Sequence, residues 1–417
     1  MMTPETLEIH RRRTRRFFMQ CGVAGIIAME SHPLLGQNSV SNQTLDEAID
    51  GIESWLTRQD EFRDISRGNP LPHELPEAEK KDVGLSRETW KLEIVSDEDD
   101  PSRLRNPLTK ETGTALDFNQ LVELGKTHAV RFPKVMSCLN IGCPLGMGIW
   151  EGVPLRKLVW MTQPVNNLRR VFYDGYHNED PSQLFRSSLS VNRILEDPTD
   201  LPPVIVCYKL NGQWLTSERG GPVRMVVPEA YGFKSIKWLN RIVLSNISHA
   251  NDTYAKQNND LDSPIKTFCN LFPTGTSYAA NTPIALTGWA QVGRAGLDKV
   301  QVWIHPNNAA LPEEDKYFKT APWRDAKILG PPKAWGGDLP DGKIVIPTKG
   351  FGASGAPEQW PLRLTKAHWA TLHPGLKPGK YTIRCRTVDK NQHAQPMPRP
   401  FRKSGHAAIQ AVNIVVS

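Results

Sequence analysis

Proline and glycine limit this chain more than any other feature. It carries 34 prolines and 31 glycines in 417 residues. Proline breaks helix interiors and central strands, and glycine weakens both, so frequent use of the pair predicts many turns between short elements. We therefore expect strands and short helices, and not an architecture of long helices.

The length predicts two folded units behind an N-terminal segment. Hydrophobic residues at 39% and charged residues at 23% are normal for a soluble globular protein. The formal net charge is +7, and five arginines against three glutamates in the first 30 residues account for two of those charges. The remaining balance is mild and has no long basic run, which favours a local anion site and argues against a nucleic-acid partner.

The N-terminus has the pattern of an export signal. Arg15 and Arg16 are followed by two phenylalanines, a short apolar run at 22–29 and a polar stretch with Pro33, which is typical of a twin-arginine signal. The apolar run is too short for a membrane span, which needs roughly 20 residues. A chance basic cluster is the stronger alternative, but the arginine pair, the aromatic residues and the apolar run occur in the order that a signal requires. We expect residues 1–36 to direct the protein to the periplasm or cell exterior, with no integral membrane segment in the mature chain.

The cysteines argue against a disulfide scaffold. The six are scattered, without a CxxC pair or a CxxCH haem motif. Cys21 falls in the export segment, so five remain in the mature protein and at least one has no intramolecular partner.

Hydrophobic periodicity divides the mature chain. One helix is expected over 41–62, with a capping box from Thr44 and Glu47, and then an extended connector over 63–81. Strands are expected near 90–95, 204–210, 223–227 and 242–244, helices near 118–124 and 155–161, and a hairpin turn at Asn211-Gly212. This mixture predicts an α+β unit. From about residue 265, strands at 284–289, 300–304, 381–386 and 409–416 predict an immunoglobulin-like β-sandwich.

Cys138 lies where a predicted strand gives way to a Gly/Pro loop. A cysteine at a strand end is more often a buried small hydrophobe than a ligand. A loop exit nevertheless lets a thiolate face a cofactor, and soft thiolates suit heavier, softer metals. Cys143, five residues on, is the rival ligand.

A second constellation spans 218–238. Two adjacent glycines, Gly220 and Gly221, permit close backbone approach, and the donors for an oxyanion come from Arg219, Arg224, Lys234, Ser235 and Lys237. The alternative is a solvated basic turn between strands. Interleaved valines argue that the segment is half buried, where unpaired cations would be costly. The pattern predicts a phosphate site.

The order of these motifs resembles the molybdopterin domain of the sulfite oxidase family. The set is Cys138, Trp150-Glu151-Gly152-Val153-Pro154-Leu155, Asp174-Gly175-Tyr176, Asn211-Gly212, Gly220-Gly221-Pro222-Val223-Arg224 and Lys234-Ser235-Ile236-Lys237-Trp238. The C-terminal part resembles the family's dimerisation domain, in Gly288-Trp289-Ala290, Trp323-Arg324-Asp325-Ala326 and Arg384-Cys385-Arg386-Thr387-Val388-Asp389. The resemblance implies a helix and connector over 37–82, a molybdopterin domain over 83–250 and a β-sandwich dimerisation domain over 265–417.

The resemblance also implies roles for individual residues. Cys138 would be the thiolate ligand of molybdenum. The molybdopterin would be bound by Asp174, Arg219, Arg224, Ser235, Ile236 and Lys237, and Tyr176 and Arg186 would face a polar substrate. Two departures keep sulfite itself from being assigned: Arg105-Asn106 is followed by Pro107 where the family has Arg-Asn-His, and Phe185 stands where it has a tyrosine. The Tyr231-Gly232-Phe233-Lys234 pattern is shared with the catalytic subunit of periplasmic methionine sulfoxide reductase.

The expected function is oxygen-atom transfer on a small oxyanion or an S- or N-oxide, with molybdopterin-bound molybdenum doing the redox chemistry. Since the chain has no haem motif, a separate carrier such as a c-type cytochrome would exchange electrons with it. A homodimer is expected through the sandwich. The alternative is a secreted binding protein that keeps the fold without activity.

Overall fold

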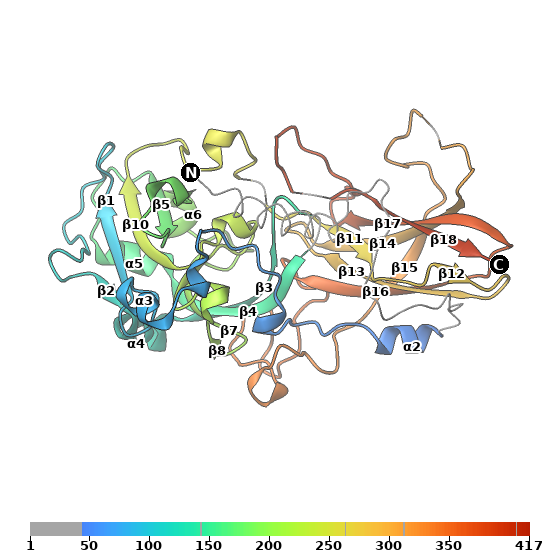
Figure 1. The fold of residues 1–417 in the computed structure, drawn as a ribbon, viewed down its shortest axis with the longest axis horizontal. Helices are drawn as coiled ribbons and strands as arrows, with labels where there is room; N and C mark the ends of the chain where they lie inside the picture. Colours follow the sequence, from blue (N-terminus) through green and yellow to red (C-terminus); the bar gives the residue numbers. More distant parts are fainter. Residues whose placement is uncertain (1–43, 142–143, 263, 312, 406) are drawn as a thin grey trace.

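The computed structural model describes residues 44–417 except 142–143, 263, 312 and 406. The expected export signal lies outside these residues. Two sheet-rich regions lie side by side along the long axis of the molecule, with the strands of the second region at the end that carries the C-terminus (Figure 1). The predicted fold class, an α+β region followed by a β-sandwich, is confirmed.

The first region contains two five-stranded sheets. One has the order β2-β1-β10-β5-β6, and the other has the order β3-β4-β7-β8 with β9 paired to β7. The strands are β1 (Lys91–Ser96), β2 (Leu116–Asp117), β3 (Val130–Ser137), β4 (Pro144–Pro154), β5 (Arg170–Gly175), β6 (Ser187–Ser190), β7 (Ile205–Leu210), β8 (Gln213–Trp214), β9 (Arg224–Val226) and β10 (Leu239–Ser245). The helices are α4 (Phe118–His128), α5 (Leu155–Met161) and α6 (Val191–Leu195).

Local sequence signals explain several of these elements. Asp117 caps α4 and forms a capping box with Gln120, which satisfies backbone N–H groups at the helix start. The hairpin between β7 and β8 turns on Asn211 and Gly212, both with positive φ (53° and 79°), as a two-residue hairpin turn requires. The expected strands, helices and hairpin of this region are confirmed.

The second region is a sandwich of two layers that share one strand. β15 pairs with β14 through its first half and with β16 through its second half, so one path runs β11-β13-β16-β15-β14-β17-β18-β12. The strands are β11 (Phe268–Leu271), β12 (Ser277–Tyr278), β13 (Ile284–Gln291), β14 (Leu297–Pro306), β15 (Arg324–Ile328), β16 (Lys366–His373), β17 (Gly379–Asp389) and β18 (Gln410–Val416). Side chains of both layers, such as Leu286, Trp369, Val300 and Ile383, form one core.

The predicted helix over 41–62 was wrong in length. The capping box of Thr44 and Glu47 is present, but α2 (Leu45–Asp50) ends at Gly51. Beyond it the chain is extended and buries Trp55, whose ring centroid lies 5.1 Å from that of Trp335 and whose Nε1 donates to the Lys366 carbonyl. Burial of this aromatic ring against the later domain outweighs the local helical pattern. The predicted connector is extended but also contains α3 (Glu77–Asp82).

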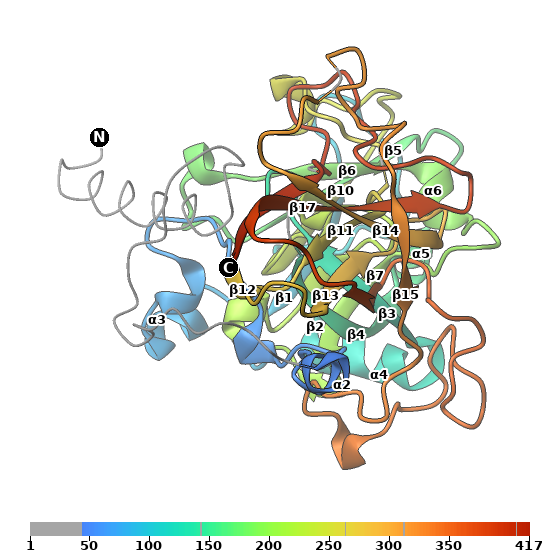
Figure 2. The same cartoon turned by 90° about the vertical axis from the view of Figure 1, so that its right-hand side faces the viewer.

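Two long segments of the second region return to the first. The segment 329–365 lies on one side of the junction, where Asn211 Nδ2 donates to the Gly337 carbonyl and Val135 N donates to the Leu364 carbonyl. The β17–β18 segment, residues 390–409, lies on the other side (Figures 1 and 2). There Gly405 packs so closely on Tyr231 that an added Cβ would clash with the tyrosine Oη. Both segments therefore bring residues of the sandwich region against the first domain.

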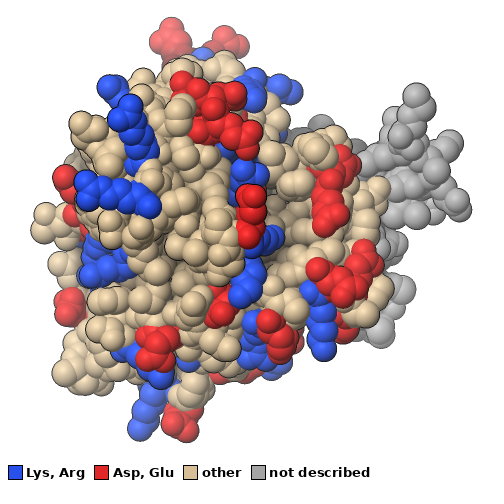
Figure 3. Space-filling view, turned by 90° about the vertical axis from the view of Figure 1, so that its left-hand side faces the viewer, with Lys and Arg blue, Asp and Glu red and all other residues tan. Residues whose placement is uncertain are grey.

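Among the described residues, none of the helices combines the length and the apolar character needed to cross a membrane. Figure 3 shows the end of the molecule formed by the first region, where basic and acidic side chains are interspersed. The charge on that face is therefore mixed in sign.

Candidate functional site

A cavity of about 1080 Å³ lies between the two sheets of the first region, the N-terminal connector and the β17–β18 segment. Its walls come from parts of the chain that are far apart in sequence, with lining residues within 62–68, 136–141, 175–185, 219–238 and 402–405 and at 145, 254 and 408. Of the residues predicted to bind the cofactor or substrate, the cavity wall contains Cys138, Tyr176, Arg219, Arg224, Ser235, Ile236 and Lys237.

Cys138 follows the last residue of β3 and lines the cavity. Burial raises the pKa of its thiol, while the backbone N–H groups of Asn140 and Ile141 and the cations Arg67 and Lys403 act in the opposite direction. The Asn140 N–H lies 3.5 Å from Sγ and points a donor at it. Such surroundings stabilise a thiolate once a metal replaces the proton. Cys143, the rival ligand, lies outside the described residues.

Arg219, Arg224 and Lys237 form a row of cations on one wall. Arg224, on β9, is 4% exposed and donates through Nη1 to the Arg219 carbonyl and through Nη2 to the Ser235 carbonyl. Burial lowers the pKa of Arg224 to about 10 and that of Lys237 to about 8. The Nε atoms of Arg219 and Arg224 are buried without a hydrogen-bond partner. Two unused buried donors on one cavity wall are suited to an anion.

The glycine pair explains how the row is assembled. A Cβ on Gly220, which has φ of 91°, would lie 2.6 Å from Lys237 Cγ, and one on Gly221 would lie 2.5 Å from the Leu215 carbonyl oxygen. Side chains at either position would push these segments apart. The close backbone approach expected from Gly220-Gly221 is confirmed, and it places Arg219 beside Lys237.

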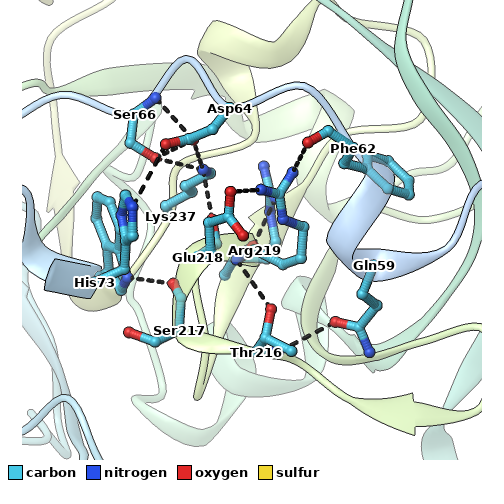
Figure 4. Close-up of polar contacts among 12 residues, drawn as sticks. Gln59, Phe62, Asp64, Ser66, His73, Thr216, Ser217, Glu218, Arg219 and Lys237 are labelled. Atoms are coloured by element: carbon cyan, nitrogen blue, oxygen red, sulfur yellow. Dashed lines mark hydrogen bonds and ion pairs between the residues drawn. The ribbon is translucent and has the colours of Figure 1, made fainter. Parts of the chain in front are cut away.

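Carboxylates of the same chain lie against these cations (Figure 4). Lys237 Nζ lies 2.8 Å from Asp64 Oδ1 and donates also to Ser66 Oγ and the Glu218 carbonyl. Arg219 Nη2 lies 2.5 Å from Glu218 Oε1, and its Nη1 donates to the Phe62 carbonyl. The pKa of Asp64 falls to about 2: burial opposes this shift, and Lys237 and Ser66 outweigh it. The connector over 62–68 is therefore tied to the cation row.

Two predicted residues do not line the cavity. Side chains alternate along a strand, so Asp174 and Phe172 lie on the same face of β5. Tyr173 lies on the opposite face, where its hydroxyl donates to the Lys234 carbonyl. The Arg186 guanidinium lies 4.7 Å from the centroid of the Phe172 ring, on the face of Asp174. Burial raises the pKa of Asp174, and Arg186 opposes that effect. Both residues lie beside the cavity rather than on its wall.

The sequence interpretation missed three residues near Cys138. Tyr254 packs edge-on against Phe185 with ring centroids 5.2 Å apart, and its hydroxyl lies 3.5 Å from Asn140 Nδ2 and 3.4 Å from Arg67 Nη2. Lys403 Nζ lies 5.7 Å from the Tyr254 ring centroid. A tyrosine hydroxyl therefore stands next to Phe185, where the sequence had indicated none. These residues are far apart in sequence, and no local pattern marks them.

The cavity suits an anionic cofactor that also takes a sulfur ligand from the protein. A thiol with N–H groups directed at it stands on one part of the wall, and buried arginines with unused donors stand on another. Cys138 would hold the metal, and Arg219, Arg224 and Lys237 would hold the phosphate of a molybdopterin. The donor set therefore fits the molybdenum cofactor.

Comparison with known proteins agrees with this chemistry. Residues 85–253 match the family model described as "Oxidoreductase molybdopterin binding domain". A nitrate reductase [NADH] of Volvox carteri is 30% identical over 129 residues, which are 30% of this chain and 15% of that protein. A nitrate reductase [NADPH] of Beauveria bassiana is 29% identical over 102 residues, which are 24% and 11%. The chain thus matches a small part of these relatives.

The fold extends the likeness beyond that segment. The sulfane dehydrogenase SoxCD from Paracoccus pantotrophus superposes with a TM-score of 0.52 at 16% identity, over 78% of this chain and 76% of that one. At this identity the likeness concerns the fold, and it includes residues outside the matched domain. The resemblance predicted from the ordered motifs is confirmed, and with it the predicted cofactor and enzyme class: residues 85–253 of this chain are a molybdopterin-binding oxidoreductase domain.

Proposed function

We propose that the protein is an exported molybdenum enzyme that transfers an oxygen atom to or from a small oxyanion or an S- or N-oxide. The observation that carries this proposal is the joint presence of Cys138 and the cation row on the walls of one cavity. The sulfite- and nitrate-type oxyanions and the oxides share a polar oxygen that such a cavity can bind. In nitrate or an S- or N-oxide this oxygen would be the atom removed, whereas sulfite would accept an oxygen atom at its sulfur.

The protein's own groups have separate tasks. When bound, the molybdenum cofactor supplies the redox chemistry. Cys138 fixes the metal's position, and the cation row anchors the phosphate end. Arg67, Lys403 and the Tyr254 hydroxyl, grouped near the thiol, would bind a substrate oxygen and stabilise charge that develops on it. Phe185 and Phe233, both packed on Tyr254, keep that hydroxyl in place.

The partners and location belong to the same proposal. The Arg15-Arg16 pattern supports export through the twin-arginine route to the periplasm, a route that carries folded, cofactor-loaded proteins. A separate carrier, such as a c-type cytochrome, would exchange electrons with the site, because the sequence has no CxxCH motif. The sandwich region would form a homodimer, which light scattering of the purified protein would detect as twice the chain mass.

The proposal is tested by metal analysis and an assay panel. Protein from a molybdenum-replete host should contain about one molybdenum per chain, with pterin fluorescence after oxidation. It should react with sulfite, an S-oxide or an N-oxide in the presence of a dye electron carrier. Protein without molybdenum and pterin would instead support the alternative of a secreted binding protein. A loaded protein that turned over none of these substrates would contradict the substrate class.

Tyr254→Phe removes only the hydroxyl near the thiol. We expect kcat to fall about 100- to 1000-fold, the usual effect of removing one transition-state donor, with molybdenum content unchanged. Steady-state kinetics on the reactive substrate measure this change. Tyr278→Phe, buried in the core of the sandwich region, is the matched control, and an equal loss in both variants would contradict the role given to Tyr254.

A further inference from the structure

Lys237 has no N–H left for a cofactor in the present arrangement. A lysine ammonium has three donors, and they go to Asp64 Oδ1 at 2.8 Å, Ser66 Oγ at 2.5 Å and the Glu218 carbonyl at 2.6 Å. Lys237 nevertheless lines the cavity, whereas Asp64 lies behind it with 23% of its side chain exposed. A phosphate can receive a hydrogen bond from Lys237 only if one of these acceptors leaves.

Asp64 and Ser66 are the acceptors that can leave together. Both belong to the connector, and Ser66 donates to Asp64 Oδ1 through its backbone N–H at 3.0 Å and through its hydroxyl at 2.5 Å. Glu218, by contrast, offers a backbone carbonyl next to Arg219, held by the turn at 216–221. The turn at Asp64–Ser66 is therefore one unit that binds Lys237 through both residues (Figure 4).

A phosphate has the charge to replace this turn. A phosphomonoester carries about −1.5 to −2 charges near neutral pH and three acceptor oxygens, against one charge on Asp64. It would also supply acceptors for the buried Nε atoms of Arg219 and Arg224, which the carboxylates outside the wall leave unpartnered. The same cations speak against a metal ion at Asp64, His73 and Glu218, whose ligand atoms lie within 4.8 Å of one another.

We propose that the Asp64–Ser66 turn is a latch that occupies Lys237 in the cofactor-free protein and is released when the cofactor's phosphate binds. The connector over 62–68 forms part of the cavity wall, so release of the latch loosens the wall through which the cofactor enters. The inference concerns the cofactor of the domain and rests on the phosphate site assigned to the cation row, and it does not depend on the substrate.

Trypsin reports the latch directly, because exposed Arg63 and Arg67 flank it. The full-length protein is prepared from a host that makes no molybdopterin, its folded state is checked by circular dichroism, and inorganic phosphate is the probe. We expect phosphate to speed cleavage after Arg63 and Arg67 several-fold. Asp64→Asn should be cleaved fast without phosphate and show little further response. Phosphate that slows cleavage or leaves it unchanged would overturn the latch.

Calorimetry of phosphate binding gives a second readout. Asp64→Asn removes the competing carboxylate and keeps its shape, so phosphate should bind about tenfold more tightly, the size of effect typical of one charge-assisted contact. Asp60→Asn, just before the connector and paired with Arg58 at the surface, is the control and should match the wild type. Equal or weaker binding by Asp64→Asn would show that Asp64 positions Lys237 and does not compete for it. Neither readout uses molybdenum or turnover, so the latch and the proposed activity can fail separately.

Discussion

Cys138→Ser should remove the activity of the molybdenum-loaded protein, with a loss of at least about 100-fold in kcat/KM, because a serine hydroxyl is a harder and far less acidic donor than a thiol. The pterin should remain bound, since Arg219, Arg224 and Lys237 hold its phosphate independently of the sulfur. The measurement pairs turnover with visible absorption, in which the thiolate-to-molybdenum charge-transfer band should disappear while the pterin content is unchanged.

The matched control is Cys143→Ser, five residues further along the chain. We expect it to keep most of the activity and the full charge-transfer band. The reverse pattern, with Cys143→Ser inactive and Cys138→Ser active, would move the ligand to Cys143. Loss in both variants with loss of pterin would point to damage to the loop rather than to the metal bond.

Much of this architecture follows from local sequence. The capping box of Thr44 and Glu47, the positive-φ pair Asn211-Gly212 and the Gly220-Gly221 approach are short-range signals, and the structure contains all of them. Each states a backbone requirement that few residue types meet. The resemblance carried by the order of Cys138 and the glycine-arginine segment implied that both bind one cofactor, and the structure places both on the walls of one cavity.

The rest depends on contacts that no local pattern encodes. The helical pattern beyond Asp50 does not form a helix, because Trp55 is buried against Trp335, more than 270 positions later in the sequence. Arg67, Tyr254 and Lys403 converge near Cys138 from three segments, one of them in the sandwich region. Their neighbours in sequence are polar and loop-like, so no local pattern marks these residues, and only the folded structure shows that they lie near Cys138.

Asp174 shows a related limit. The ordered motif Asp174-Gly175-Tyr176 located the right strand end, and Gly175 and Tyr176 do line the cavity. The aspartate itself faces Arg186, because the strand still alternates at that position. A motif therefore indicates which segment meets the cavity, whereas the pleat of the strand decides which side chain enters it.

Arg224→Ala should have a large effect on stability as well as on the cofactor. The guanidinium is buried 5.1 Å from the Trp150 ring centroid and is the donor to the Arg219 and Ser235 carbonyls. Without the guanidinium, both carbonyls lose this hydrogen-bond donor and a cavity remains beneath β9. The two effects together should lower the free energy of unfolding by about 3 kcal/mol or more. Urea unfolding of the cofactor-free protein measures this loss. Retained pterin in the purified protein should also fall to a small fraction of the wild-type amount.

Two variants separate geometry from charge at this position. Arg224→Lys keeps a cation but cannot reach both carbonyls in the forked geometry of arginine, so it should recover only part of the stability and of the bound pterin. Arg241→Ala, on β10, removes an exposed arginine whose partner Glu98 is 89% exposed, and it should change the free energy of unfolding by no more than about 0.5 kcal/mol. If Arg224→Ala unfolded like Arg241→Ala and kept its pterin, the buried guanidinium would hold neither the fold nor the phosphate. The cofactor's anchor would then have to lie with Arg219 and Lys237 alone.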